Sequence, residues 1–159
     1  MSTTSPNMAA LTTPERLASP TPGGRWLSNG NYSVLVTRAG TGWSRASGYA
    51  LTRWTADRIE NRTGFFVFVH DTATGSFFSV TEEPAGAAAE SRVFSSAPGR
   101  VRFVRQGQGL ESRLDVCVLA DRDAELRRLT ITNTGASPRT LDVTSWADVV
   151  LNQPAADAS

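Results

Sequence analysis

The sequence has no lysine, one cysteine, one histidine and no long hydrophobic run. Its 16 basic residues are all arginine and are interleaved with 15 acidic residues, which gives a formal net charge of +1. This balance provides no clustered positive surface, so we expect no nucleic-acid partner. No apolar stretch approaches the roughly 18 residues that a spanning helix needs. The N-terminus also lacks the charged and apolar regions of a signal peptide. We therefore expect a soluble, cytoplasmic protein.

The scarcity of cysteine and histidine limits the chemistry that the chain can perform. Cys117 lies in an alternating apolar run and has no second cysteine to pair with, so a buried structural thiol is expected. His70 is followed by Asp71, but neighbouring side chains on a strand point to opposite faces and cannot pair with each other. One His and one Cys do not supply the several ligands of a zinc site. We expect no metal site and no cofactor.

Catalytic motifs are incomplete throughout the chain. The segment Gly42–Ala46 narrowly misses the G-x-S-x-G elbow, because alanine stands where the second glycine belongs. Gly40 and Gly42 do not extend to a dinucleotide-binding glycine pattern, since position 45 is arginine. Glu82 and Glu83 are adjacent, whereas acid/base carboxylates normally face each other across a cleft. The chain therefore shows no complete catalytic set, and we expect it not to be an enzyme by itself.

Two regions differ sharply in composition. Residues 1–24 are rich in Ser, Thr, Pro and Ala and poor in apolar residues, which predicts a flexible arm or linker. Residues 25–152 consist of short β-type runs separated by glycine turns, without a helical period. This pattern predicts an all-β domain, a large antiparallel β-sandwich. The expected strands are Tyr32–Thr37, Tyr49–Trp54, Phe65–Asp71, Ser76–Val80, Ser91–Ser95, Arg100–Arg105, Leu110–Ala120, Glu125–Asn133 and Arg139–Leu151.

Alternation within these runs predicts which side chains are buried. Leu114, Val116 and Val118 alternate with less apolar residues, as in a half-buried strand. The run FFVFV at residues 65–69 is apolar on both faces, which is typical of a central strand covered on both sides. Arg100, Arg102 and Arg105 are expected on a solvated outer face, in preference to a phosphate site.

The segment AGTGWSRASGYALTRW, residues 39–54, raises the main functional question. Its glycines and small residues predict a loop that carries Trp43, Ser44 and Arg45. In one interpretation the aromatic residues simply pack against the sheet, and the glycines shape a long turn. In the other, the loop contacts a saccharide, because sugar C–H faces pack on Trp or Tyr while Arg and Ser bond hydroxyl groups. Both interpretations stay open at this point.

Three blocks of sequence carry a resemblance to a known family. The first is LSNGNYSVLVTRAGTGWSR followed by ALTRW, the second is FFVFVHD, and the third is LRRLTITNTGASPRTLDVTSWADVVLNQPAADAS. From Leu27 to Ser159 the chain resembles the N-terminal β-sandwich domain of glycoside hydrolase family 94, in the branch of cyclic β-1,2-glucan synthases and 1,2-β-oligoglucan phosphorylases. Trp43 stands where that family usually has Tyr, and His70 where it has Arg. Ala46-Ser47-Gly48 replaces a frequent Trp-Arg-Asp.

The resemblance implies a galactose-mutarotase-like supersandwich, with residues 153–159 starting a linker to an (α/α)6 catalytic domain that this chain lacks. It implies partners of three kinds: a β-glucan oligosaccharide shared with that domain, the domain itself, and a second copy in a homodimer. It leaves open whether the parent enzyme is attached to the inner membrane through regions outside this chain. The alternatives are a self-sufficient sugar-binding module and a purely structural dimerisation or inter-domain scaffold. The sugar or interface contacts carried over from the family are Trp43, Ser44, Arg45, Arg53 and Trp54.

Overall fold

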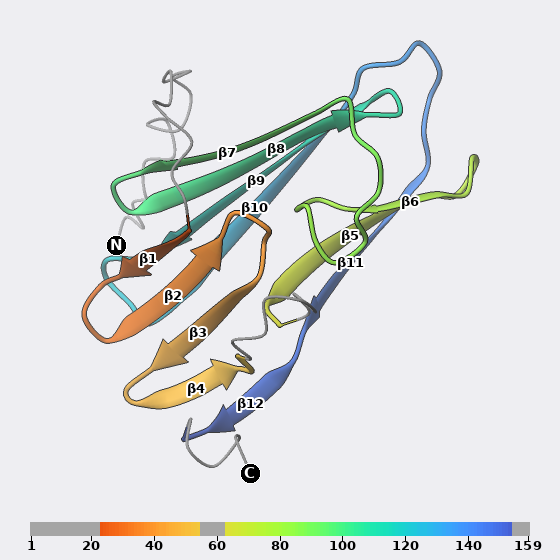
Figure 1. The fold of residues 1–159 in the computed structure, drawn as a ribbon. Helices are drawn as coiled ribbons and strands as arrows, with labels where there is room; N and C mark the ends of the chain where they lie inside the picture. Colours follow the sequence, from red (N-terminus) through yellow and green to blue (C-terminus); the bar gives the residue numbers. More distant parts are fainter. Residues whose placement is uncertain (1–22, 55–62, 154–159) are drawn as a thin grey trace, which may run out of the picture.

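The computed structural model describes residues 23–54 and 63–153, and this part of the chain consists of β-strands and their connections (Figure 1). The predicted arm at residues 1–24 and the predicted linker at residues 153–159 fall almost entirely outside the described residues. The strands are β1 (Gly24–Ser28), β2 (Tyr32–Thr37), β3 (Gly42–Ala46), β4 (Tyr49–Thr52), β5 (Phe65–Asp71), β6 (Ser76–Ser79), β7 (Ser91–Ala97), β8 (Arg100–Gly107), β9 (Leu110–Val118), β10 (Glu125–Asn133), β11 (Leu141–Ala147) and β12 (Val149–Asn152).

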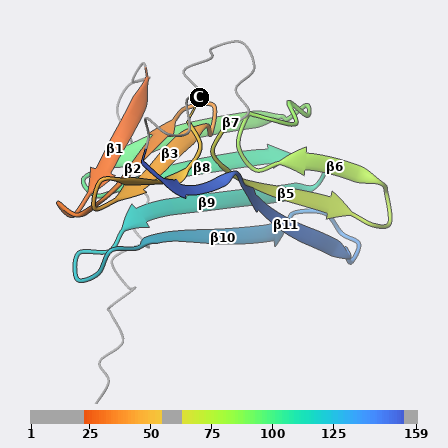
Figure 2. The same cartoon turned by 90° about the horizontal axis from the view of Figure 1, so that it is seen from below.

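The described strands form three antiparallel sheets. Sheet A has the order β1-β2-β3-β4-β12, sheet B the order β11-β5-β6, and sheet C the order β10-β9-β8-β7. Figure 2 shows sheet C lying along one side of sheets A and B. The predicted all-β antiparallel sandwich is therefore confirmed.

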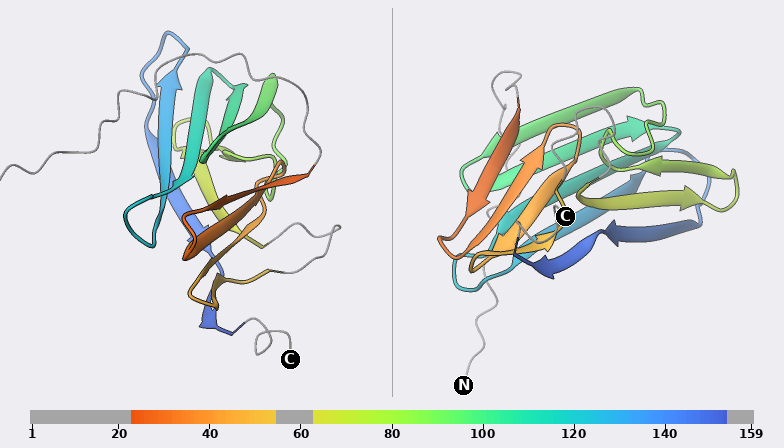
Figure 3. Two further views of the ribbon diagram at one scale, coloured as in Figure 1. Left: turned by 90° about the vertical axis from the view of Figure 1, so that its left-hand side faces the viewer. Right: turned by 60° about the horizontal axis from the view of Figure 1, so that its bottom comes forward.

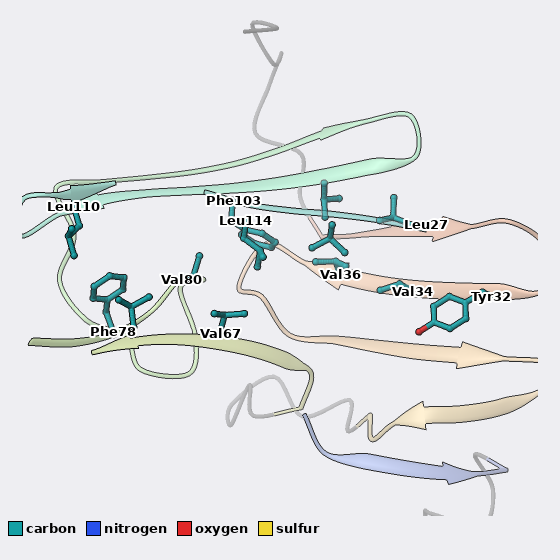
Figure 4. Packing of buried hydrophobic residues seen from close by; sticks show 13 residues of the cluster. Leu27, Tyr32, Val34, Val36, Val67, Phe78, Val80, Phe103, Leu110 and Leu114 are labelled. Atoms are coloured by element: carbon teal, nitrogen blue, oxygen red, sulfur yellow. The ribbon is translucent and has the colours of Figure 1, made fainter. Parts of the chain in front are cut away.

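The hydrophobic core lies between sheet C and the other two sheets (Figure 4). Val34 and Val36 of β2 and Phe78 of β6 project towards Phe103 and Leu114 of sheet C. The strands alternate between core and outer face, so each contributes every second residue to this layer. The predicted alternation in β9 is confirmed in part: Leu114 and Val116 are fully buried in the core and Val118 is half-buried, but Asp115 on the other face is buried as well.

The predicted loop around Trp43 is wrong, because residues 42–46 form β3 in the middle of sheet A. A tight turn precedes it, in which Gly40 has φ +98° and Thr37 bonds the Thr41 carbonyl. At Gly42 the chain passes so close to β2 that an added Cβ would lie 2.3 Å from the Leu35 carbonyl oxygen. The glycines thus serve a tight turn and a close strand approach, which resemble a flexible loop in sequence.

Two other strand predictions needed correction. The strand β1 was not predicted, although it pairs with β2 from Ser33 to Thr37. The predicted strand Arg139–Leu151 is divided into β11 and β12, which pair with β5 and β4 respectively. Figure 3 shows how this segment runs from sheet B to sheet A, so that one stretch of chain joins the two sheets.

The prediction that Arg105 lies on a solvated face is wrong. With a period of two residues, Arg105 shares the inner face of β8 with Val101 and Phe103, and it is only 1% exposed. Its guanidinium lies 3.9 Å from the centre of the Phe78 ring, and its Nη2 donates to the Ala88 carbonyl at 2.7 Å. Burial lowers the pKa of the Arg105 guanidinium, and the positive charge of Arg92 lowers it further. Arg100 and Arg102 lie on the outer face, as expected, but the Arg102 side chain is only 15% exposed.

The end of β5 carries one ion pair and one contact between a histidine and a carboxylate. His70 Nδ1 lies 3.7 Å from Asp142 Oδ2 on β11, whereas Asp71 contacts Arg139, so His70 and Asp71 have different partners, as predicted. Asp71 is fully buried and accepts hydrogen bonds from Arg139 and from the Ala73 backbone N–H. The Arg139 guanidinium holds the pKa of this carboxyl below its usual range. The pair fastens the start of β11 to β5.

The outer face of sheet B is aromatic. Phe68 stacks on Phe77 with ring centres 5.4 Å apart, and Phe66 stacks on Trp146 at 6.0 Å. β5 is the central strand of its sheet, but the prediction of cover on both sides is only partly met. Phe66 is buried, whereas Phe68 is half-buried and Phe77 and Trp146 are exposed.

Candidate functional site

Two tryptophans and one arginine meet on the outer face of sheet A. Residues opposite each other in the register share a face, so Trp26 of β1, Leu35 of β2 and Trp43 of β3 lie in one row. The two indole rings have an edge-to-face arrangement, with centres 6.1 Å apart and planes inclined by 68°. The Arg45 Cζ lies 5.7 Å from the Trp26 ring and 5.5 Å from the Trp43 ring. We call Trp26, Trp43 and Arg45 the outer-face cluster.

The outer-face cluster combines exposed aromatic surface with hydrogen-bond donors. Trp26 is 54% exposed, Trp43 is half-buried and Arg45 is exposed. Among the described residues, the Arg45 guanidinium has no carboxylate within ion-pair distance and donates no hydrogen bond, and its exposed side chain leaves the N–H donors open to solvent. Cation–π contacts hold the guanidinium over the rings without using these donors. The cluster can thus pack against a flat apolar face and donate to oxygen atoms beside it.

Ser44 lies on the opposite face of β3 from Trp43 and Arg45. It is 2% exposed, and its Oγ lies 3.3 Å from Glu125 Oε2 while its backbone N–H donates to Thr52 Oγ1. Burial raises the pKa of the neighbouring Tyr32, and the charge of Glu125 raises it further. Ser44 therefore joins sheet A to sheet C in the interior, and the structure does not bring it to the outer-face cluster.

Arg53 and Trp54 follow β4, at the junction of sheets A and B. Arg53 Nη1 lies 3.2 Å from Asp148 Oδ2, and the Arg53 backbone N–H donates to the Asp148 carbonyl at 2.8 Å. Asp148 lies between β11 and β12, so this pair fixes the point where the chain changes sheet. Trp54 is 37% exposed and is the last described residue before the gap at 55–62.

Trp26 was missed in the sequence reasoning. It stands next to the predicted arm and 17 positions before Trp43, and only the pairing of β1 with β2 places it beside Trp43. A signal was present, because the apolar residues Trp26 and Leu27 follow shortly after two glycines. Such a run next to a predicted strand indicates an edge strand.

A shallow hollow adjoins the outer-face cluster at the free edge of β1. It measures about 350 Å³ and lies between β1 and the turn that joins β7 to β8. Arg25 Nε donates to Ser96 Oγ at 3.0 Å across this gap, and Trp26 and Arg100 line its sides. The aromatic surface of Trp26 therefore continues into a concave region rather than ending at the sheet edge.

Within residues 23–54 and 63–153, no three His, Cys, Asp or Glu side chains come together as metal ligands. The same part of the chain has no helix that is long and apolar enough to cross a membrane. His70 and Cys117 lie on different sheets, on β5 and β9. Cys117 is half-buried rather than buried, and burial raises the pKa of its thiol.

The fold and the outer-face cluster together define a β-sandwich domain with an exposed aromatic and basic surface. The chain belongs to glycosyl hydrolase family 94, since the model of the family's supersandwich domain matches residues 8–159. This confirms both the resemblance drawn from the sequence blocks and the supersandwich that it implied.

Two proteins of known activity are similar in sequence. Cyclic beta-(1,2)-glucan synthase NdvB from Rhizobium meliloti (strain 1021) is 43% identical over 133 residues, which cover 84% of this chain. Cellobionic acid phosphorylase from Neurospora crassa is 31% identical over 83 residues, or 52% of this chain. The matched regions make up only 5% and 10% of these two relatives, respectively.

Proposed function

We propose that this chain is a non-catalytic domain of a glucan-active enzyme and that its outer-face cluster contacts a β-glucan oligosaccharide. The family and the names of the two relatives support a glucan-related parent, either a synthase or a phosphorylase. In this proposal the (α/α)6 catalytic domain carries the chemistry and shares the oligosaccharide with the sandwich. The observation that carries the proposal is the placement of Arg45 beside both Trp26 and Trp43.

The chemistry of the cluster suits a neutral sugar chain. An indole ring packs against the C–H groups on one face of a pyranose, while a guanidinium donates to ring and hydroxyl oxygens. The two rings are inclined by 68°, so they present differently oriented surfaces. A bent chain, whose successive sugar rings are rotated relative to each other, fits two inclined indole rings better than a chain of coplanar sugar rings does. This favours β-1,2-linked glucan over β-1,4-linked glucan.

A second candidate function is an inter-domain or dimerisation scaffold without sugar affinity. It is favoured by the aromatic outer face of sheet B and by the exposed apolar side chains of β12 in sheet A. Phe77, Trp146, Val149 and Leu151 are 52%, 45%, 60% and 68% exposed, respectively. Exposed apolar residues grouped in this way are typical of an interface. The outer-face cluster lies on β1 and β3, whereas these residues lie on sheet B and on β12, so variants can separate the two functions.

The test is calorimetric titration of the 159-residue chain with β-1,2-gluco-oligosaccharides, with β-1,3 and β-1,4 chains as controls. We expect selective binding that Trp43→Ala and Arg45→Ala each abolish. The matched control is Trp146→Ala, which removes an exposed tryptophan from sheet B and leaves sheet A intact. Flat titrations with a folded chain, together with a concentration-dependent dimer that Trp146→Ala weakens, would favour the scaffold function instead.

A further inference from the structure

The outer face of sheet C carries four arginines around one aspartate. Asp115 of β9 lies between Arg102 of β8 and Arg128 of β10 in one row of the register. Arg113 stands two positions before Asp115 on the same strand, and Arg100 occupies the next outward position of β8. Four guanidinium groups around one carboxylate leave three positive charges uncompensated within this patch. Like charges on neighbouring strands destabilise a sheet, so the arrangement needs an explanation.

Both oxygens of Asp115 are already engaged. Arg102 Nε lies 2.6 Å from Oδ1, and Arg113 Nε lies 3.5 Å from Oδ2. The Asp115 carboxylate is largely buried beneath these two side chains. Among the described residues, neither Arg100 nor Arg128 has a carboxylate oxygen within ion-pair distance. The Nη2 of Arg102 is also shielded from solvent without a hydrogen-bond partner. The patch therefore holds more donors than its single carboxylate can accept.

Arg100 and Arg128 line the same hollow. It measures about 350 Å³, and Cys117 and Leu126 line it together with the turn at residues 98–99. Cys117 is opposite Arg100 on one side and opposite Leu126 on the other, so Arg100 and Arg128 rise from strands on either side of β9. Strands two places apart are separated by about 10 Å, which two extended arginine side chains can bridge through a ligand between them. A volume of this size suits a small molecule of the size of a sugar phosphate.

We infer that this hollow is a binding site for a phosphate group, either inorganic phosphate or a phosphate ester of a sugar. Arg100 and Arg128 supply planar pairs of N–H donors, which match the oxygens of a phosphate in geometry and in charge. Asp115 lines the hollow, but Arg102 and Arg113 neutralise it. Leu126 and the turn at residues 98–99 offer apolar surface beside the charged end, where a sugar ring of an ester would lie. The site shares Arg100 and the turn at residues 98–99 with the hollow beside Trp26, whereas Arg128 lines only the hollow on sheet C.

The test is titration of the whole chain with inorganic phosphate and, separately, with glucose 1-phosphate, at constant ionic strength set with sodium chloride. Glucose serves as the neutral control. Because a hydrogen bond to a charged group contributes about 1.5–3 kcal/mol, we expect Arg100→Gln and Arg128→Gln each to weaken binding roughly tenfold or more. Arg122→Gln is the matched control, since Arg122 is an exposed arginine that pairs with Asp121 outside the hollow.

The outcomes are distinct. Saturable binding of both phosphates, lost in Arg100→Gln and Arg128→Gln but kept in Arg122→Gln, supports a site for the phosphate group alone. Binding of the ester only, with the same pattern among the variants, supports a site that also requires the sugar. No saturable binding at millimolar concentration, or equal binding by all three variants, would overturn the inference. Trp43→Ala is expected to bind phosphate as the unchanged chain does, which separates this site from the outer-face cluster.

Discussion

Replacing Arg105 by methionine tests what a charged side chain costs in the core of this sandwich. Arg105 is 1% exposed, and within the described residues its guanidinium has no carboxylate within ion-pair distance. Its Nε and Nη1 lack hydrogen-bond partners, whereas Nη2 donates to the Ala88 carbonyl. Methionine has an unbranched side chain of similar length that can fill the same space above Phe78. The substitution therefore removes the charge without leaving a large cavity.

The magnitude follows from the contacts that Arg105 makes and lacks. Each buried donor without a partner costs about 1–3 kcal/mol, so Nε and Nη1 together cost about 2–6 kcal/mol. Against this stand the contact with Phe78, worth about 2 kcal/mol when desolvated, and one charged hydrogen bond worth about 1.5–3 kcal/mol. The two sides nearly cancel before the cost of burying the charge itself is added. We expect Arg105→Met to raise the free energy of unfolding by about 1–3 kcal/mol, in line with other replacements of buried charges.

The assay is urea unfolding at neutral pH, followed by tryptophan fluorescence and circular dichroism. Arg105→Ala is the matched variant, because it removes the same charge but leaves a cavity, and we expect it to lower the free energy of unfolding by about 2–4 kcal/mol. A lower free energy of unfolding in Arg105→Met than in the unchanged chain, with an unchanged slope against urea, would refute the reasoning. The guanidinium would then be a net stabilising element of the core.

Three further predictions concern pH, packing and thiol chemistry. Because the pKa of Asp71 is lowered in the folded state, its carboxylate contributes stability above the unfolded-state pKa, and this stability is lost as pH falls through the folded-state pKa. The difference in free energy of unfolding between the unchanged chain and Asp71→Asn, measured by urea unfolding, should therefore shrink from pH 7 to pH 3. A constant difference would contradict this. Gly42→Ala should lower the free energy of unfolding by about 1–3 kcal/mol and weaken oligosaccharide binding, because the added Cβ would collide with the Leu35 carbonyl oxygen. Calorimetry of thermal unfolding and of oligosaccharide binding measures these two effects. Cys117 should react with a disulfide reagent at pH 7.5 more slowly than free cysteine does, since burial raises its thiol pKa; an equal rate would show an accessible thiolate.

Much of the fold could be predicted because its strands carry local signals. The bounds of β2, β5 and β10 agree with the sequence prediction, since alternation and flanking turn residues mark both ends. The prediction failed where a local signal has two meanings. The glycines at 40 and 42 indicate flexibility in isolation, yet here one forms a turn and the other permits close pairing of β3 with β2. The segment 139–151 has no break in its composition, and the division at Asp148 arises because its two halves pair with different sheets.

The sequence by itself determined the fold class, the family and two members of the candidate site, Trp43 and Arg45. These depend on residue type and on spacing along the chain, which are local properties. Only the tertiary structure decided which side chains share a face. Strand pairing places Trp26 beside Trp43, and the two-residue period turns Ser44 into the interior. Register is set by contacts between strands far apart in sequence, and a shift of one residue would exchange the two faces.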